Sequence, residues 1–148
     1  MRNPVIRAAV PTDAQQMAEL DKVCFTVPWS LDSFEQELAA NDRAIYIVAE
    51  KDGQLAGYAG MWQILDEGHI TNVAVAPEQR RQGIATSVLA ALIAEGGRRG
   101  IRAFTLEVRA SNVAAQELYR GFGFQSAGIR PGYYEDNKEA AVIMWRTE

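Results

Sequence analysis

Residues 70–94, ITNVAVAPEQRRQGIATSVLAALIA, encode a strand, a short turn and a helix in direct succession. A β-branched run comes first, and apolar residues recur at helical spacing from Ile84 onward. The turn contains Gly83, whose missing Cβ lets an anion approach the main-chain amides. These amides precede a helix, which adds partial positive charge, and Arg80 and Arg81 add formal charge. The stretch therefore predicts a binding site for a phosphate or pyrophosphate group.

Two common nucleotide-binding loops do not fit this turn. A Walker loop needs a Gly-Lys-Ser/Thr sequence and a Rossmann fingerprint needs three spaced glycines, and the turn contains neither. We therefore do not expect a nucleoside triphosphate as the ligand. Taken alone, the turn also fits a simple connection between a strand and a helix, with arginines that face solvent.

The composition favours one globular domain, which we expect to span residues 1–148. Of the 148 residues 48% are hydrophobic, enough for a substantial core, and a net charge of −4 without a basic stripe does not favour nucleic-acid binding. Cys24 is the single cysteine and His69 the single histidine, which excludes a disulfide framework and zinc sites with several Cys or His ligands. No apolar run reaches the length of a membrane span, and we expect a cytoplasmic protein.

Helical and strand patterns alternate along the chain, which predicts a mixed α/β fold. Asp52-Gly53 predicts a hairpin within a three-strand antiparallel meander, and a Thr12–Gln15 capping box predicts the start of the first helix. The strand after the long helix must return parallel to the meander by a right-handed crossover. We therefore expect a mixed, mostly antiparallel central sheet of about seven strands, flanked by about four helices. Strands are predicted at 5–8, 44–51, 54–65, 69–75, 102–108, 124–129 and 140–146, and helices at about 12–23, 30–40, 84–97 and 112–122.

Two parts of the chain resemble one enzyme superfamily. The turn Arg80-x-x-Gly83-x-Ala85 resembles the Arg/Gln-x-x-Gly-x-Gly/Ala signature of the GNAT superfamily of N-acetyltransferases. Residues 106–124 are similar to one branch, the bacterial ribosomal-protein alanine N-acetyltransferases of the RimI type. Further similarity at 27–30, 66–67, 72–75, 130 and 133–134 extends it over most of the chain. The resemblance implies the GNAT fold and an acetyltransferase that uses acetyl-CoA as co-substrate, without a metal.

The resemblance also implies where acetyl-CoA would bind. The pyrophosphate contacts would come from Arg81, Gln82, Gly83, Ile84, Ala85 and Thr86. The thioester and the pantetheine amides would bind, like an added strand, to the backbone of Val73, Ala74 and Val75. Asn112 would be a further contact, and asparagine at this position also fits an ordinary helix N-cap. The cluster Arg98, Arg99 and Arg102 fits a solvated helix end better than a second phosphate site.

Two residues are candidates for the chemistry of transfer. By the resemblance, Glu107 accepts the amine proton, and Tyr119 gives a proton or hydrogen bond to the sulfur of coenzyme A. Glu107 stands between two apolar residues of a predicted strand, so we expect its carboxylate to be partly desolvated and its pKa to be raised. Tyr119 lies on an apolar helix face and also fits a core aromatic. Direct attack in a ternary complex is a simpler route than an acetyl intermediate on Cys24.

The acceptor is inferred from the resemblance and from amine chemistry. Trp29, Arg130, Tyr133 and Tyr134 would line the peptide channel, although aromatic loop residues also pack over sheet edges. An α-amine has a pKa of roughly 7.7 to 8.0 and a lysine roughly 10.4, so a single modest base suits an α-amine better. The resemblance implies the N-terminal alanine of a ribosomal protein.

Two alternatives stay open at this point. One is an acetyltransferase that acts on lysine or on a small amine, and the other is an acyl-CoA-binding module without catalysis. The chain also departs from the family pattern within residues 134–141, where Glu139-Ala140 stands in place of the usual Glu-Asp. This departure weakens the inference about the acceptor.

Overall fold

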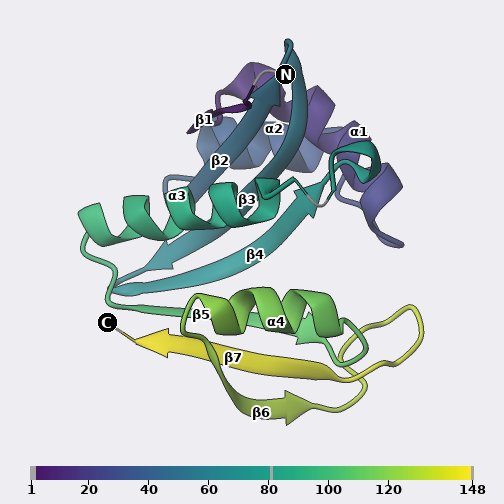
Figure 1. Cartoon of the computed structure of the whole chain (residues 1–148), viewed down its shortest axis with the longest axis vertical. Helices are drawn as coiled ribbons and strands as arrows, with labels where there is room; N and C mark the ends of the chain where they lie inside the picture. The colour runs from purple at the N-terminus through teal and green to yellow at the C-terminus, as the bar shows by residue number, and fades with distance from the viewer. Residues whose placement is uncertain (1–2, 81, 148) are drawn as a thin grey trace.

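The computed structural model describes residues 3–80 and 82–147, which form a seven-stranded sheet with helices on both faces (Figure 1). In chain order the elements are β1 (Val5–Ala8), α1 (Ala14–Cys24), α2 (Leu31–Ala40), β2 (Ala44–Lys51), β3 (Gln54–Ile64), β4 (Glu67–Val75), α3 (Ile84–Arg98), β5 (Ala103–Arg109), α4 (Val113–Gly121), β6 (Gln125–Arg130) and β7 (Ala141–Thr147). The strands lie in the order β1-β2-β3-β4-β5-β7-β6. Only β4 and β5 pair in parallel among these neighbours. The predicted mixed, mostly antiparallel sheet is confirmed.

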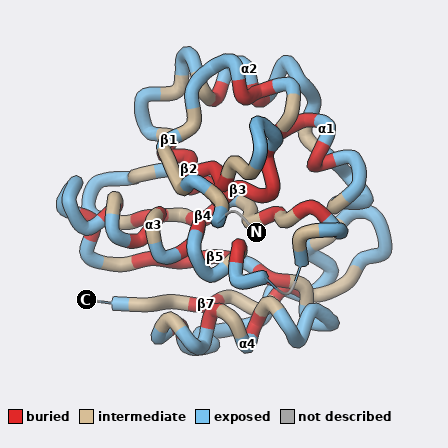
Figure 2. The backbone as a smooth tube through the Cα atoms, turned by 45° about the horizontal axis from the view of Figure 1, so that its top comes forward, coloured by how far each residue is buried: buried red, intermediate tan, exposed pale blue. Residues whose placement is uncertain are grey.

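Each face of the sheet has its own hydrophobic core. Side chains alternate along β2, so that Ile45 and Ile47 face α3, whereas Tyr46 and Val48 face α1 and α2. Helix α4 packs on the same face as α3, through residues that include the buried Tyr119. Figure 2 shows the buried segments in the layers between helices and sheet. The central strands are therefore apolar on both sides, as strands covered on two faces must be.

Short-range signals place several elements as predicted. The turn between β2 and β3 has two residues in the left-handed region, Asp52 with φ 54° and Gly53 with φ 81°, which matches the twist of a tight hairpin. Ser30 caps α2, because its hydroxyl accepts the N–H of Ser33 at 3.1 Å. Asn112 caps α4 in the same way. These predictions are confirmed.

The predicted start of the first helix is wrong in detail. Thr12 lies in a short 3₁₀ turn, Pro11–Asp13, and α1 follows it without a side-chain capping hydrogen bond. The Asp13 carboxylate instead accepts the N–H of Val10 at 2.8 Å and forms an ion pair with Arg7 at 2.8 Å. This ion pair with β1 therefore takes the place of the Thr12–Gln15 capping box.

Strands β4 and β5 separate after a short parallel contact (Figure 1). Their pairing covers only Glu67–His69 with Ala103–Thr105. The pairing of β3 with β4 shifts between Gly60 and Met61, which leaves Thr71 as one extra residue on β4. Such a bulge bends the strand that carries it and increases the local twist. Among the described residues, the edge of β4 beyond this pairing consequently has no strand partner on the β5 side.

The start of α3 lies close to the sheet because β3 has a glycine beneath it. A Cβ added at Gly57 would lie 2.9 Å from Ile84 Cγ2 and 2.8 Å from the carbonyl oxygen of Ala74. A larger residue would push the first turn of the helix outward. Gly57 therefore sets the position of the turn that leads into α3.

Candidate active site

The Gly83 turn, which in the described structure comprises Arg80 and residues 82–86, joins the end of β4 to α3. Gly83 has φ 78°, in the left-handed region, and a Cβ added there would meet no atom of the described residues within 4 Å. Ser87 donates its N–H to the carbonyl oxygen of Gly83 at 3.0 Å, and the amides before Ser87 lie in the helix's first turn. An open glycine at a helix N-terminus is the feature on which the anion-binding prediction rests. Arg81, a further predicted contact, lies outside the described residues.

The other predicted contacts of this turn differ in how their side chains lie. Ile84 is buried in the core, so only its main chain can take part in binding at the turn. Ala85 is half-buried, and Gln82 and Thr86 are exposed. Gln82 Oε1 accepts a hydrogen bond from Lys51 Nζ at 3.3 Å. The turn therefore offers main-chain amides chiefly, with polar side chains at its rim.

The main chain of β4 faces two directions. Ala76 donates its N–H to the carbonyl oxygen of Ala56 on the β3 side at 2.8 Å. Because main-chain groups alternate along a strand, those of Ala74 also face β3, and those of Val73 and Val75 face the open edge. The Val73 main chain and the Val75 N–H thus face the space between β4 and β5, whereas the Val75 carbonyl oxygen accepts hydrogen bonds from Cys24 Sγ and Arg80 Nε, each at 3.3 Å.

The Cys24 thiol serves as a hydrogen-bond donor. Its Sγ lies 3.3 Å from the carbonyl oxygen of Val75, and Arg80 Nη2 lies 3.8 Å from the same sulfur. Burial raises the pKa of this thiol, although the arginine acts in the opposite direction. Since the thiolate is the nucleophilic form, this setting disfavours a covalent acetyl intermediate on Cys24.

Glu107 lies on β5 beyond the point where β4 departs. Its side chain is 33% exposed, so the carboxylate is less desolvated than its two apolar neighbours in the sequence suggest. The alternation of the strand explains the difference, because Leu106 and Val108 point into the core and Glu107 points to the other face. Arg130 Nε lies 3.8 Å from Glu107 Oε1 in a long ion pair. The carboxylate is therefore in contact with water as well as with a cation.

Tyr119 is both a core residue and a free hydrogen-bond donor. Its ring is buried and packs edge-on against Phe124, with 5.8 Å between ring centroids. Its hydroxyl makes no hydrogen bond with the residues that the structure describes. Burial, with a smaller effect of Tyr134, raises the pKa of Tyr119 to about 12. The two interpretations of this residue are therefore compatible.

Arg109 fastens the loop between β6 and β7, a role that was not predicted. Its guanidinium donates to Asp136 Oδ2 at 2.8 Å and to Glu139 Oε1 at 3.2 Å, and lies 4.0 Å from the ring centroid of Tyr134. Glu139 Oε2 also accepts the main-chain N–H of Ser111 at 2.7 Å. The acidic character of residues 135–139, opposite in charge to an arginine on a strand, is the sequence signal that could have indicated this contact.

The structure brings part of the predicted acceptor site together. The ring of Tyr134 lies against the guanidinium of Arg109, which follows Glu107 by two residues on β5. The same ring packs edge-on against that of Tyr133, with 5.0 Å between centroids. Burial raises the pKa of Tyr134 to about 12, against the opposing effect of Arg109. Trp29 lies apart from this group, on the α2 side, where its ring packs 5.4 Å from that of Phe34. The predicted acceptor residues thus belong to two separate walls.

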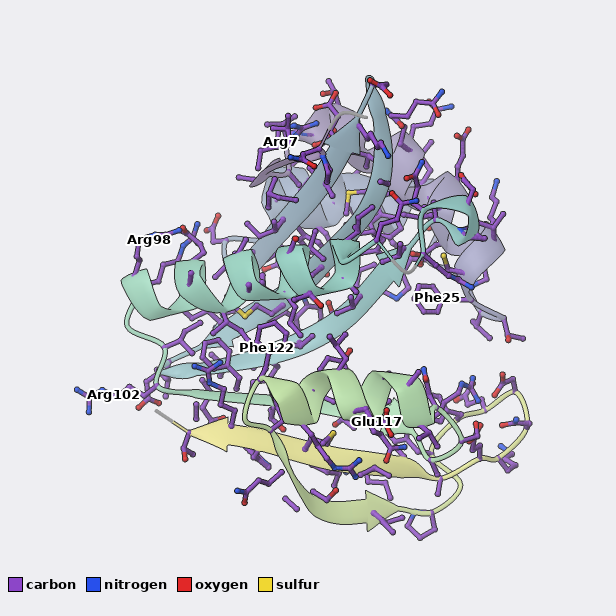
Figure 3. The ribbon with its side chains drawn as sticks, in the orientation of Figure 1. Arg7, Phe25, Arg98, Arg102, Glu117 and Phe122 are labelled. Atoms are coloured by element: carbon purple, nitrogen blue, oxygen red, sulfur yellow. The ribbon has the colours of Figure 1, made fainter. Side chains whose placement is uncertain are left out.

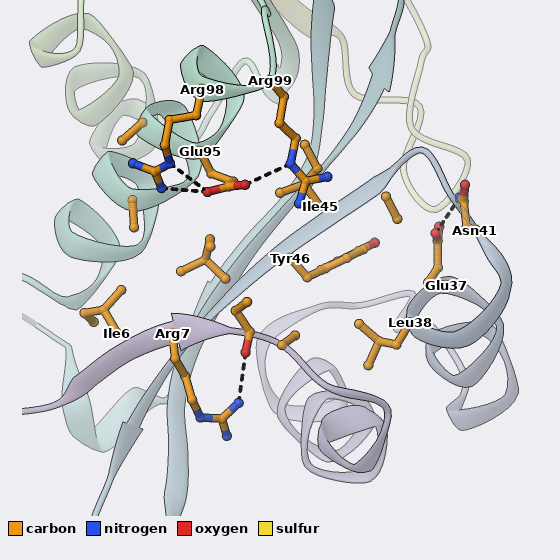
Figure 4. Close-up of a pocket in the computed structure, with 16 residues that line it drawn as sticks. Ile6, Arg7, Glu37, Leu38, Asn41, Ile45, Tyr46, Glu95, Arg98 and Arg99 are labelled. Carbon is orange, nitrogen blue, oxygen red and sulfur yellow. Dashed lines mark hydrogen bonds and ion pairs between the residues drawn. The ribbon is translucent and has the colours of Figure 1, made fainter.

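A hollow of about 520 Å³ lies between β1, β2 and the ends of α2 and α3 (Figure 4). Arg98 and Arg99 at its rim form ion pairs with Glu95 at 2.6 and 2.9 Å. None of the predicted site residues within the described part of the chain lines this hollow. Arg98 and Arg102 point away from the molecule (Figure 3), and the predicted solvated cluster at the end of α3 is confirmed.

Among residues 3–80 and 82–147, no group of three or more His, Cys, Asp or Glu side chains is arranged to hold a metal ion. None of the helices in these segments combines the length and hydrophobicity that crossing a membrane requires.

Comparison with known sequences places the chain in a family. A profile of the Acetyltransferase (GNAT) family matches residues 14–124. A Bacillus subtilis (strain 168) protein, named provisionally as a ribosomal protein bS18-alanine N-acetyltransferase, is 45% identical over 91% of this chain and 89% of its own. The ribosomal protein bS18-alanine N-acetyltransferase of Escherichia coli (strain K12) is 37% identical over 90% of each chain.

Solved structures agree with this assignment. The ribosomal-protein-S18-alanine N-acetyltransferase of Escherichia coli has a TM-score of 0.89 and 34% identity, and the match covers 97% of this chain and 93% of that one. Ard1 of Thermoplasma volcanium has a TM-score of 0.88 over 99% and 98% of the two chains, and at 22% identity this likeness concerns the fold alone. The chain therefore belongs to the GNAT family of acetyltransferases, enzymes that use acetyl-CoA as co-substrate.

Proposed function

We propose that this acetyltransferase acts on the N-terminal α-amine of a protein, the alanine of a ribosomal protein. The observation that carries the proposal is the separation of β4 from β5, which leaves the Gly83 turn on one side and Glu107 on the other. The names of the two sequence relatives support the choice of acceptor. We treat residues 1–148 as one N-acetyltransferase domain, and a ribosomal-protein acceptor would place the reaction in the cytoplasm.

The residues around the Gly83 turn fit the co-substrate. Gly83 and the first-turn amides of α3 would hold the pyrophosphate, because no side chain at Gly83 blocks them. Val73 and Val75 would offer main-chain groups to the pantetheine amides. Asn112 Oδ1 already accepts the N–H of Ala115 at 3.1 Å, which leaves its amide nitrogen for a further contact. When bound, acetyl-CoA supplies an acetyl thioester.

Proton transfer would be shared by two residues. Glu107, in contact with water, would accept the proton that the acceptor ammonium must lose, directly or through one water molecule. Tyr119 would hydrogen-bond to the departing sulfur and protonate it. With a pKa of about 12, its hydroxyl stays protonated at neutral pH and so remains able to donate. Transfer would then proceed by direct attack in a ternary complex.

The acceptor would enter between the two walls that carry Trp29 and Tyr134. Tyr133 and Arg130 would contact its backbone beside Glu107. An α-amine loses its proton more easily than a lysine by roughly 3.4 kcal/mol at neutral pH. Glu107 is a single carboxylate base, and the smaller cost of deprotonating the α-amine favours that acceptor. An acetyltransferase for lysine or small amines is the second candidate.

The decisive experiment compares three acceptors at equal concentration with acetyl-CoA. These are an alanine-starting peptide, the same peptide with a blocked N-terminus and one lysine, and a polyamine. We expect product only with the free α-amine, detected by mass spectrometry and by release of the coenzyme A thiol. Turnover restricted to the other two acceptors would contradict the proposal. Binding of coenzyme A without product from any amine would instead favour a binding module.

A further inference from the structure

A chain of hydrogen bonds runs from the β4 bulge to the loop between α1 and α2. Thr71 Oγ1 donates to Asn72 Oδ1 at 2.8 Å, and Asn72 Nδ2 donates to the hydroxyl of Tyr58 at 2.8 Å. Tyr58 in turn donates to Asp21 Oδ1. The other carboxylate oxygen, Asp21 Oδ2, accepts the main-chain N–H of Trp29 at 3.0 Å. We call Asp21, Tyr58 and Asn72 the Asp21 network.

The centre of this network is buried and contains no cation. Asp21 is 1% exposed and Tyr58 is fully buried, and Asp21 forms no ion pair with the described residues. A carboxyl group in such a place is costly unless donors satisfy it. Every donor in the chain points toward Asp21, so each group fixes the orientation of the next. The Asn72 amide does not relay protons, which indicates a role in orientation.

Asp21 also holds both ends of the loop that carries Trp29. Phe25 donates its N–H to the main-chain oxygen of Asp21 at 2.9 Å, and Trp29 donates to the side chain. These are the hydrogen bonds that the structure records from residues 25–29. The recorded hydrogen bonds of this loop therefore converge on Asp21, and the side-chain bond to Trp29 acts beside the packing of the Trp29 ring on Phe34.

We propose that Asp21, Tyr58 and Asn72 are positioning residues, which hold Trp29 in place relative to the β4 bulge before the acceptor binds. This proposal rests on the proposed function, since it takes Trp29 as part of the acceptor wall. The network touches the acceptor side of the site, whereas the Gly83 turn lies beyond it. Its loss should therefore weaken acceptor binding and leave acetyl-CoA binding largely intact.

The test compares two buried tyrosines of the same core. Tyr58→Phe removes the hydroxyl that links Asn72 to Asp21. Tyr46→Phe is the matched control, because Tyr46 is 5% exposed, its ring lies 6.3 Å from that of Tyr58, and its hydroxyl makes no well-formed hydrogen bond among the described residues (Figure 4). Each variant is assayed for the KM of an alanine-starting peptide, for the KM of acetyl-CoA, and for amide hydrogen exchange of Trp29 in the free protein.

We expect Tyr58→Phe to raise the peptide KM roughly tenfold, the size of effect that follows when one buried hydrogen-bond acceptor, an oxygen of Asp21, loses its donor. The acetyl-CoA KM should stay within about twofold. Exchange of the Trp29 amide should accelerate by roughly tenfold or more. The control should leave all three quantities close to the unmodified protein. An unchanged peptide KM and Trp29 exchange, or an equal rise of both KM values, would overturn the proposal.

A second variant keeps the proposal testable if Tyr58→Phe does not fold. Asn72→Ala removes the donor to Tyr58 at a half-buried position, and we expect the same pattern with a smaller amplitude. Unchanged exchange at Trp29 in this variant would count against the network. If the unmodified protein acetylates no alanine peptide, the proposed function fails, while the exchange measurement still decides the positioning role.

Discussion

The two sides of the diverging strands hold their polar groups by different means. Beside β4, Asp21 and Tyr58 are buried and joined by hydrogen bonds within the core. Beside β5, Arg109 and its partners Asp136 and Glu139 lie near the surface and are joined by ion pairs. A buried hydrogen bond is little affected by salt, whereas water and salt screen a surface ion pair. We therefore expect the β4 side to be the more rigid of the two and the β5 side to be the more adjustable.

The difference matches the work assigned to each side. A thioester must be held in one orientation, which suits a rigid wall with a glycine turn at its end. The β5 side must admit a protein terminus and exchange a proton with water through Glu107, which suits exposure and a loop held by charges. We therefore expect changes at the Gly83 turn to alter co-substrate binding and changes in the Asp21 network to alter acceptor binding. Changes beside β5 should alter turnover or acceptor binding.

The largest expected effect tests the chemical role of the β5 side. Tyr119→Phe keeps the ring that packs on Phe124 and removes the hydroxyl. We expect kcat to fall roughly 100-fold to 1,000-fold, the usual range for losing a general acid. Coenzyme A affinity, measured by calorimetry, should stay within about threefold. A variant that loses coenzyme A affinity and keeps kcat would show that Tyr119 serves co-substrate binding and not proton transfer, which would contradict the contrast between the two sides.

The next largest effect tests the β4 side at the Gly83 turn. Gly83→Ala adds a Cβ at φ 78°, which strains the backbone and occupies the approach to the amides. We expect the acetyl-CoA KM to rise roughly tenfold at little cost in kcat, because the added Cβ keeps the pyrophosphate away from the main-chain amides. The strain, about 1–2 kcal/mol, should lower thermal stability.

Gly53→Ala is the matched control for this strain. Gly53 has φ 81° and equally open surroundings, but it lies in the β2–β3 hairpin away from the Gly83 turn. We expect a similar loss of thermal stability in both variants and an unchanged acetyl-CoA KM in the control. Equal KM values for the two variants would show that Gly83 has no part in binding.

A smaller effect is expected from the ion pairs of the β5 side. Arg109→Lys keeps the charge but cannot reach Asp136 and Glu139 together with the same planar group. We expect the peptide KM to rise roughly fivefold, with faster amide exchange at Ser111, whose N–H donates to Glu139. Added salt should accelerate exchange at Ser111 in the unmodified protein and leave Trp29 unchanged. A similar response of both amides would remove the contrast between the walls.

The smallest expected effect is the dependence of folding stability on pH, which has opposite signs on the two sides. Hydrogen bonding from Arg109 lowers the pKa of Asp136, and hydrogen bonding from Ser111 lowers that of Glu139. Their contribution to stability is present above the ordinary carboxyl pKa, roughly 4, and is lost as pH falls through the folded values. Burial raises the pKa of Asp21, so the folded state binds this proton more readily, and stability at this site rises as pH falls toward the ordinary value.

Carboxyl carbon titration by NMR checks these directions. Asp21 should titrate above the ordinary value for an aspartate, and Asp136 and Glu139 below the ordinary values for their residue types. A midpoint of Asp21 at or below that of Asp136 would contradict the contrast between a buried and a surface wall.

The match to the family profile covers one part of the candidate site and leaves out another. It spans residues 14–124, which include the Gly83 turn, Glu107 and Tyr119, and ends before the β6–β7 loop. The parts that were predicted from motifs lie inside this span. The departure noted around Glu139 lies outside it, where the structure shows an ion pair with Arg109 at 3.2 Å. Acceptor contacts are therefore the part of the site for which a sequence pattern is least informative.

Signals between near neighbours in the chain were sufficient for most of the fold. The Asp52-Gly53 hairpin and the Ser30 cap depend on a few adjacent residues, and the structure has both. The predicted capping box at Thr12–Gln15 is wrong because Asp13, the residue before α1, forms an ion pair with Arg7 of β1. A local rule holds until a tertiary contact of greater energy competes with it.

The candidate site shows the same difference between local signals and tertiary contacts. The amino-acid sequence alone determined the strand order of the meander, the Gly83 turn, and that Glu107 lies on a strand and Tyr119 on a helix, because alternation, glycine and helix spacing act over short separations. The roles of Glu107 and Tyr119 in the chemistry come from the resemblance and stay predictions. Only the tertiary structure decided that Glu107 is exposed, that Arg109 holds Glu139, and that Asp21 meets Tyr58. Those contacts join residues 30 and 37 positions apart, and their geometry depends on how the whole sheet packs and bends.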